Sequence, residues 1–84
     1  MENKIYKWIE IQKILESESG KTDIFEIRTK DDKIIIAQIK WSPRWRKYSF
    51  QPFPNTEYEE ECMDSISDFL RMLKEERKKK CNLK

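Results

Sequence analysis

Residues 23 to 41 read DIFEIRTKDDKIIIAQIKW, and this stretch decides the fold class. Phe25 and Ile27 alternate with charged side chains, which is typical of a strand with one buried face. The charged residues 30 to 33 indicate a short turn, and the isoleucine-rich run after them alternates from Ala37 onward. The stretch therefore predicts an antiparallel hairpin whose second strand lies in the middle of a sheet.

Towards the C-terminus, a proline interrupts the sheet and a further strand follows. Pro43 has no amide donor and biases the residue before it away from helix, so we expect residues 45 to 51, WRKYSFQ, to form the next strand after a tight turn. Pro52 and Pro54 then end it. Residues 23 to 53 are thus predicted to be antiparallel strands.

Towards the N-terminus, residues 5 to 15 read IYKWIEIQKIL and leave two interpretations open. The isoleucines suit one face of a strand, whereas Ile5, Trp8 and Leu15 suit one face of a helix. The isoleucine and aromatic content favours a strand. The polar stretch that follows, ESESGKTD, predicts a loop.

Residues 57 to 76 predict a helix. Thr56 followed by Glu59 matches a capping box, and acids just inside the start favour the helix dipole. Apolar residues then recur at spacings of three and four and form one stripe: Tyr58, Cys62, Ile66, Phe69, Leu70 and Leu73. Beyond this pattern we expect residues 77 to 84 to be a frayed basic tail.

These elements predict an α+β fold, with an antiparallel sheet of three to four strands packed against one long C-terminal helix. At 84 residues, we expect one domain spanning residues 1–84, which can bury only a modest core. The chain has no histidine, no glycine-rich phosphate cradle and no nucleophile motif. We therefore expect no catalytic residues, no cofactor and no metal, and not an enzyme.

The sequence predicts a cytoplasmic protein with no membrane partner. There is no run of 18 apolar residues and no secretory signal pattern at the start. Cys62 and Cys81 form no CxxC pair, and we expect Cys62 to be a core residue rather than a nucleophile. The carboxylates between Glu57 and Asp64 predict a solvated helix start rather than a divalent-cation site.

Residues 40 to 50 read KWSPRWRKYSF and interleave aromatic side chains with cations. From Lys33 to Thr56 the chain has five cations and no acid. Aromatic rings stack on nucleobases at roughly 1–3 kcal/mol per base, and cations release counterions when they bind phosphates. The stretch is typical of a surface for single-stranded nucleic acid or a nucleotide. The expected binding residues are Arg28, Lys40, Trp41, Arg44, Trp45, Arg46 and Lys47.

Strand alternation divides these residues between the two faces of the sheet. If Phe25 and Phe50 face the helix, part of the set emerges on the opposite, open face: Arg28, Lys40, Trp45 and Lys47. The alternative is that both tryptophans close a small core and the cations only keep the sheet edge soluble. Alternation alone leaves the faces of the two tryptophans open.

Residues 37 to 41 read AQIKW, and a spaced set of residues follows them: Pro43, Trp45, Arg46, Tyr48, Phe50, Pro52, Cys62, Ile66 and Phe69. This arrangement resembles a family of short uncharacterised proteins encoded by bacteriophages and prophages. Their pattern is G-E-I-K-W-Y-x-x-W-R-x-Y-x-F-x-P with a later C-L-x-x-I-x-x-F, and the match spans residues 37–70. The departures are Ala37, Gln38, Ser42 and Met63. The resemblance implies phage origin, and hence the cytoplasm of a bacterial host, but no particular activity.

The predicted order of strands then helix also resembles the PC4-like transcriptional-coactivator fold. The resemblance is one of architecture, without a shared motif. Its members dimerise and bind single-stranded DNA on a curved sheet, so the resemblance implies a homodimer with that ligand.

Two functions follow from these observations. The first is a small non-enzymatic phage-type protein that binds single-stranded nucleic acid or a nucleotide. The second is an inhibitor of a bacterial defence protein, of the anti-CRISPR or anti-restriction type, which acts by protein–protein binding. In it, the acids from Glu57 to Glu61 imitate phosphates or the aromatic hairpin docks on the partner.

Overall fold

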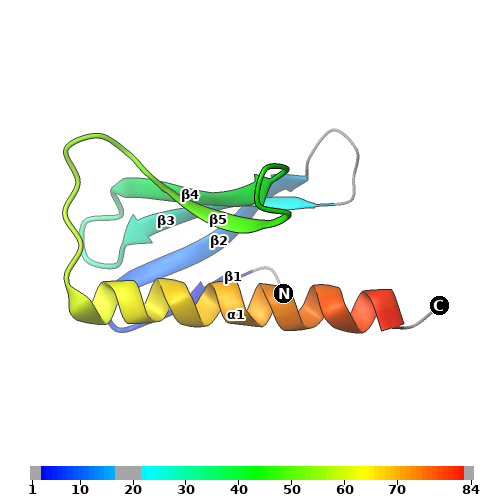
Figure 1. Ribbon diagram of the computed structural model, residues 1–84. Helices are drawn as coiled ribbons and strands as arrows, with labels where there is room; N and C mark the ends of the chain where they lie inside the picture. Colours follow the sequence, from blue (N-terminus) through cyan, green and yellow to red (C-terminus); the bar gives the residue numbers. More distant parts are fainter. Residues whose placement is uncertain (1–2, 17–21, 83–84) are drawn as a thin grey trace.

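Five strands and then one helix follow one another in the computed structural model, which describes residues 3–16 and 22–82, with side chains up to residue 79 (Figure 1). The predicted loop after β2 lies mostly outside these residues. The elements are β1 (Asn3–Ile5), β2 (Ile9–Glu16), β3 (Asp23–Thr29), β4 (Ile35–Ser42), β5 (Lys47–Pro52) and α1 (Glu60–Asn82).

The strands form one sheet in the order β1-β2-β3-β4-β5, each antiparallel to its neighbours. The predicted α+β class, with an antiparallel sheet and a C-terminal helix, is confirmed. The predicted number of strands was too low, because the N-terminal segment contributes two strands. The sheet curves over α1, which covers one of its faces (Figure 1).

The N-terminal segment forms a tight hairpin of two strands and not a helix. Its isoleucine content had favoured a strand. The turn is closed by a hydrogen bond from the Tyr6 amide to the carbonyl of Ile9, at 2.8 Å. Tyr6 Oη donates to Asp68 Oδ2 of α1 at 2.8 Å, and Trp8 Nε1 donates to Glu61 Oε2 at 2.6 Å. These bonds attach the turn to the helix. Burial, with the bond to Asp68, raises the pKa of Tyr6.

The hairpin of β3 and β4 forms as predicted. Phe25 pairs with Ile39 and Ile27 with Ala37, and all four side chains are buried. The register shifts just beyond Ile27, where the strands approach their turn. The hairpin therefore supplies the centre of the sheet.

The next strand begins at Lys47, two residues later than predicted. Residues 43–46 form a turn in which the Arg46 amide donates to the carbonyl of Ser42 at 2.8 Å. Arg46 has a φ of 55°, in the left-handed region, so the chain cannot be extended there. Trp45 consequently lies on the turn and not on a strand face.

The helix is displaced and longer than predicted, covering Glu60–Asn82 rather than residues 57–76. Glu59 and not Thr56 caps it, because Glu59 accepts hydrogen bonds from the amides of Glu61 at 3.0 Å and Cys62 at 2.6 Å. The basic segment expected to fray stays helical to Asn82. Lysine and arginine are good helix formers and favour the negative end of the helix dipole.

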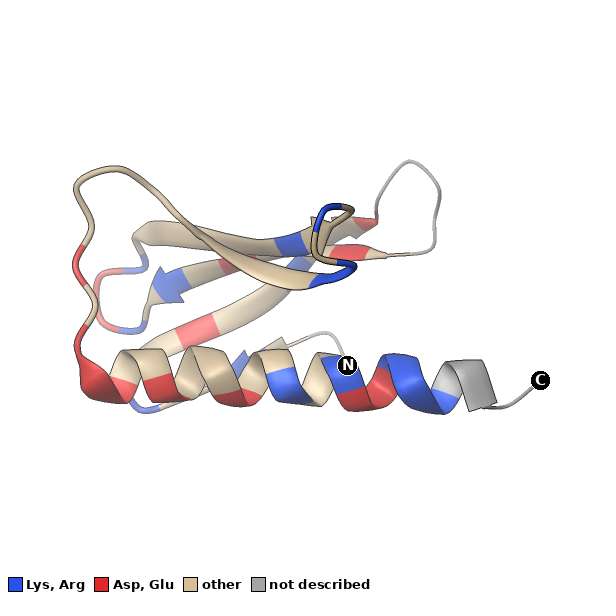
Figure 2. Cartoon of the chain, viewed as in Figure 1, with Lys and Arg blue, Asp and Glu red and all other residues tan. Residues whose placement is uncertain are grey.

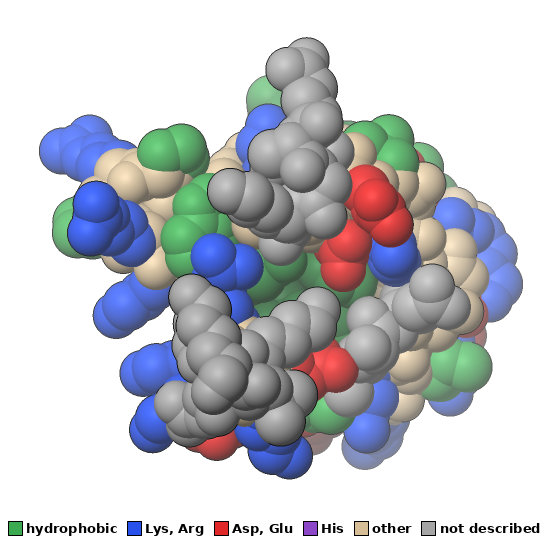
Figure 3. Space-filling view, turned by 90° about the vertical axis from the view of Figure 1, so that its right-hand side faces the viewer, with side chains coloured by type: hydrophobic (Ala, Val, Ile, Leu, Met, Phe, Trp, Pro, Cys, Tyr) green, Lys and Arg blue, Asp and Glu red, His purple; other side chains and the backbone are tan. Residues whose placement is uncertain are grey.

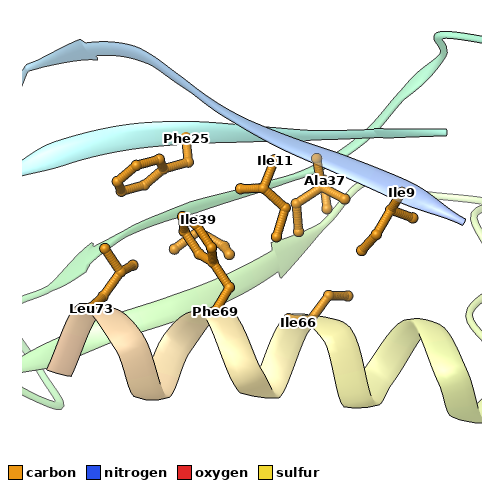
Figure 4. Close-up of a cluster of buried hydrophobic side chains, with 9 residues drawn as sticks. Ile9, Ile11, Phe25, Ala37, Ile39, Ile66, Phe69 and Leu73 are labelled. Carbon is orange, nitrogen blue, oxygen red and sulfur yellow. The ribbon is translucent and has the colours of Figure 1, made fainter. Parts of the chain in front are cut away.

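The core lies between the sheet and α1 (Figure 4). Ile66, Phe69 and Leu73 point from the helix to side chains that descend from the strands. The rings of Phe25 and Phe69 meet edge to face, with centroids 5.1 Å apart. Nine described residues are buried in it: Ile9, Ile11, Phe25, Ile27, Ala37, Ile39, Ile66, Phe69 and Leu73. In the described part of the chain, no helix combines the length and apolar character needed to span a membrane.

Candidate functional site

An open groove of about 560 Å³ lies between the turn end of the β4–β5 hairpin and the C-terminal half of α1. We call it the basic groove. Figure 3 views this end of the molecule, where Lys and Arg side chains gather along one side with hydrophobic side chains between them. Its lining residues are Trp41, Arg46, Lys47, Tyr48, Ser67, Leu70, Arg71, Lys74, Arg77 and Lys78.

Six of the lining residues are cations, and the described residues that line the groove include no acid. The hairpin contributes Arg46 and Lys47. The helix contributes four cations at spacings that keep them on one side of α1: Arg71, Lys74, Arg77 and Lys78. Figure 2 shows blue segments on both elements at this end. A hollow lined by one sign of charge focuses its electrostatic field, so the groove attracts anions.

Trp41 lies in the wall of the groove, on the helix-facing side of β4. It follows Ile39 by two residues and therefore shares the face of that buried side chain. Its ring meets Tyr48 edge to face, with centroids 5.6 Å apart and planes at 86°. The Arg77 guanidinium lies 4.1 Å from the Trp41 ring centroid. Trp41 therefore holds Arg77 in position by a cation–π contact between strand and helix.

Trp45 lies on the β4–β5 turn and is 66% exposed. The Trp45 ring contacts Arg44, whose guanidinium is 5.6 Å from the ring centroid. Trp45 is next to Arg46 in the chain but is not among the residues that line the groove. An exposed ring between two arginines on a turn can stack on a nucleobase.

Arg28 and Lys40 lie away from the groove, on the face of the sheet opposite α1. Arg28 forms an ion pair with Glu26, with Nη2 and Oε1 3.4 Å apart. Glu10, opposite Arg28 in the register, pairs with Lys33. This face therefore carries charges of both signs, and the structure does not bring Arg28 and Lys40 together with the other expected residues.

Four of the groove cations were missing from the sequence-based set. Arg71 and Lys74 were expected on the polar face of the helix with no sign of what lies beside it, and Arg77 and Lys78 were expected in a frayed tail. The signal was present in the spacing, since Arg71, Lys74 and Lys78 recur at three and four residues along one side of a helix. What the sequence did not reveal is that this side lies next to the β4–β5 hairpin.

The other end of the molecule is acidic. A hollow of about 490 Å³ beside the start of α1 is lined in part by Asp31, Asp32, Glu57, Glu59 and Glu61. Hydrogen bonds from two backbone amides lower the pKa of Glu59. Among the described residues, no three side chains of the types that bind metals converge on one point. Of these acids, Glu59 caps the helix and Glu61 accepts the hydrogen bond from Trp8.

Cys62 lies at the edge of the core, as the apolar stripe predicts. Burial, followed by the hydrogen bond with Glu59, raises the pKa of its thiol. A thiol held in its protonated form is a poor nucleophile.

No family model matches the chain, and no solved structure gives a significant match. An “Uncharacterized 9.3 kDa protein” of Acholeplasma phage L2 is 33% identical over 58 residues, which are 69% of this chain and 74% of that protein. By this identity and coverage, the chain belongs to the same family as the Acholeplasma phage L2 protein.

Proposed function

We propose that the protein is a non-enzymatic phage-type binding protein that holds single-stranded nucleic acid or a nucleotide in the basic groove. The observation that carries the proposal is one groove whose lining combines Trp41 with six cations from two elements far apart in the sequence. A solubilising charge pattern would instead spread cations among acids, as on the opposite face of the sheet.

Each part of the groove has a role in this function. The cations bind phosphates, and the release of counterions from the nucleic acid supplies most of the affinity. Trp41 keeps the Arg77 guanidinium in place, so that less rotamer entropy is lost when a phosphate binds. Trp45 supplies a stacking surface on the turn, next to Arg46 in the chain.

The test is a titration of a fluorescein-labelled oligothymidylate with the protein at several salt concentrations, read by anisotropy. The site variant is Lys74→Gln, and the matched control is Lys30→Gln, an exposed lysine at the other end of the molecule. Both variants lose the same charge. Lys74→Gln should weaken binding several-fold and reduce the slope of log K against log salt by about 0.7.

Lys30→Gln should change binding much less than Lys74→Gln. Equal losses from the two variants would mean that net charge and not the groove attracts the nucleic acid. An affinity that does not change with salt would contradict phosphate binding altogether.

A second candidate function is inhibition of a bacterial defence protein by protein–protein binding. The acidic hollow beside the start of α1 supports it, because Glu57 and its acidic neighbours could meet a basic nucleic-acid site on a partner. In that case, a purified defence nuclease should form a complex that Glu57→Gln weakens and Lys74→Gln leaves intact. The phage relative supports either function in the cytoplasm of a bacterial host.

A further inference from the structure

We propose that the ligand class of the basic groove is a single strand several nucleotides long, in preference to a free nucleotide or a duplex. This inference rests on the proposed function and specifies its ligand. It predicts a path, with phosphates along α1 in the groove and a base stacked on Trp45 where the strand leaves it.

The helix cations that line the groove form a row from Arg71 to Lys78, and the length of this row favours a strand over a single nucleotide. Arg71 and Lys78 lie seven residues apart on α1, which corresponds to about 10 Å at about 1.5 Å per residue. A stacked strand rises about 3.4 Å per nucleotide along its axis, and consecutive phosphates are farther apart than this because the backbone winds around the axis. Two consecutive phosphates can therefore lie beside this row, whereas one nucleotide occupies only part of it.

The number of charges carries the second step. Six cations line the groove without an acid among its described lining, and one of them, Arg71, is paired with Asp68 beside the groove, with Nη2 and Oδ1 3.9 Å apart. A phosphate monoester brings about −1.5 to −2 charges at neutral pH, so a nucleoside monophosphate leaves most of these cations uncompensated. A strand brings one charge per nucleotide, and four to six nucleotides match the groove.

The position of Trp45 carries the third step. It is exposed on the turn and does not line the groove, so a ligand that contacts Trp45 and the helix cations has to extend beyond the groove. A strand can do this and offer an unpaired base to the ring. The bases of a duplex are stacked on one another and would have to unstack first.

The two walls of the groove carry the fourth step. Arg46 and Lys47 line the groove on the hairpin side, while Lys74 and Arg77 line it on the helix side. Cations on both walls can surround the backbone of one strand. A rigid duplex would contact only the rims, because its two backbones lie on the outside of a wide cylinder.

The experiment is a competition series against a labelled oligothymidylate, read by anisotropy at one salt concentration. The competitors are thymidine monophosphate, oligothymidylates from about two to about twelve nucleotides, and a duplex of the longest length. We expect the affinity to rise tenfold or more from the monophosphate to about six nucleotides and then to level off. The duplex should compete more weakly than the single strand of equal length.

Trp45→Ala is the matched variant, because its side chain is on an exposed turn and outside the core. It should weaken the longer oligothymidylates about fivefold or more and leave the monophosphate nearly unchanged. Circular dichroism confirms that the variant is folded. A loss that is the same for every competitor would overturn the proposed path.

The remaining outcomes distinguish failure of this inference from failure of the proposed function on which it rests. Equal affinity for the monophosphate and the hexanucleotide would overturn the strand and leave a nucleotide site. A duplex that competes as well as the single strand would also overturn the inference. Failure of the labelled oligothymidylate and of thymidine monophosphate to bind at low salt would overturn the proposed function itself.

Discussion

Trp41 and Trp45 lie four residues apart, yet the fold gives them different surroundings. Trp41 packs between Tyr48 and Arg77, so both its position and that of the guanidinium are fixed by strand and helix together. Trp45 is on the turn with its ring open to solvent. The first is therefore suited to positioning a cation and the second to stacking on a ligand.

Trp45→Ala should reduce the free energy of binding to single-stranded oligonucleotides by about 1–3 kcal/mol. Because the lost contact is not ionic, the slope of log K against log salt should stay as in the unmodified protein. Trp45→Phe, which keeps a ring, should retain most of the affinity. Titrations at several salt concentrations measure both quantities, and undiminished binding by Trp45→Ala would exclude this residue from the site.

Arg77→Ala should lower the free energy of unfolding by about 0.5–1 kcal/mol, because it removes the cation–π contact with Trp41. It should also shift the fluorescence emission of Trp41. Lys79→Ala is the control, since Lys79 is exposed on the same helix end and does not line the groove. Urea unfolding followed by fluorescence measures the effect, and equal stability of the two variants would contradict the contact.

At the scale of elements, the sequence predicted the central strands well and their neighbours less well. Phe25 and Ile27 alternate with charges, so the period alone identified the strand. The turn Tyr6-Lys7-Trp8 contains none of the residues that usually mark turns, and the N-terminal hairpin was read as one segment. The last turns of α1 carry no apolar period, yet residues of high helix propensity extend it to Asn82.

The stability of the start of α1 should depend on pH through Glu59. Two amide donors lower the pKa of its carboxyl in the folded protein. The stabilisation is therefore present above the pKa of an unfolded glutamate and is lost as the pH falls through the lower folded value. Glu59→Ala should lower the melting temperature at pH 7, and the difference from the unmodified protein should shrink in acid.

Thermal unfolding followed by circular dichroism at neutral and acid pH measures this difference. Glu60→Ala is the control, because the amide bonds that cap the helix go to Glu59. If the melting temperature of Glu59→Ala stays below that of the unmodified protein by the same amount down to pH 3, the carboxylate does not stabilise the helix start.

At the scale of the molecule, charge is divided between the ends. The hairpin turn and the second half of α1 are basic, and the first turn of α1 with the segment before it is acidic (Figure 2). The field of such a molecule orients a polyanion towards the groove during approach and repels it from the other end. A net charge of only +2 is therefore compatible with a strong local attraction of polyanions to the basic groove.

The candidate site could be predicted only in part, for a physical reason. Trp41, Arg46 and Lys47 were identified because aromatic and cationic residues alternate over a short stretch. Lys74 and Arg77 were not, because a helix period says which residues share a side but not where on the sheet the helix lies. The contact of Arg77 with Trp41 joins the part of the site on the β4–β5 hairpin to the part on α1.

The measurement that tests the basic groove most directly is a two-dimensional amide NMR spectrum recorded while an oligothymidylate is added. The three tryptophan indole N–H signals report three different places in the molecule. We predict that the signals of Trp41 and Trp45 shift and that the signal of Trp8, bonded to Glu61 at the acidic end, stays in place. Shifts centred on Trp8 or on Arg28, with Trp41 and Trp45 unmoved, would contradict the account.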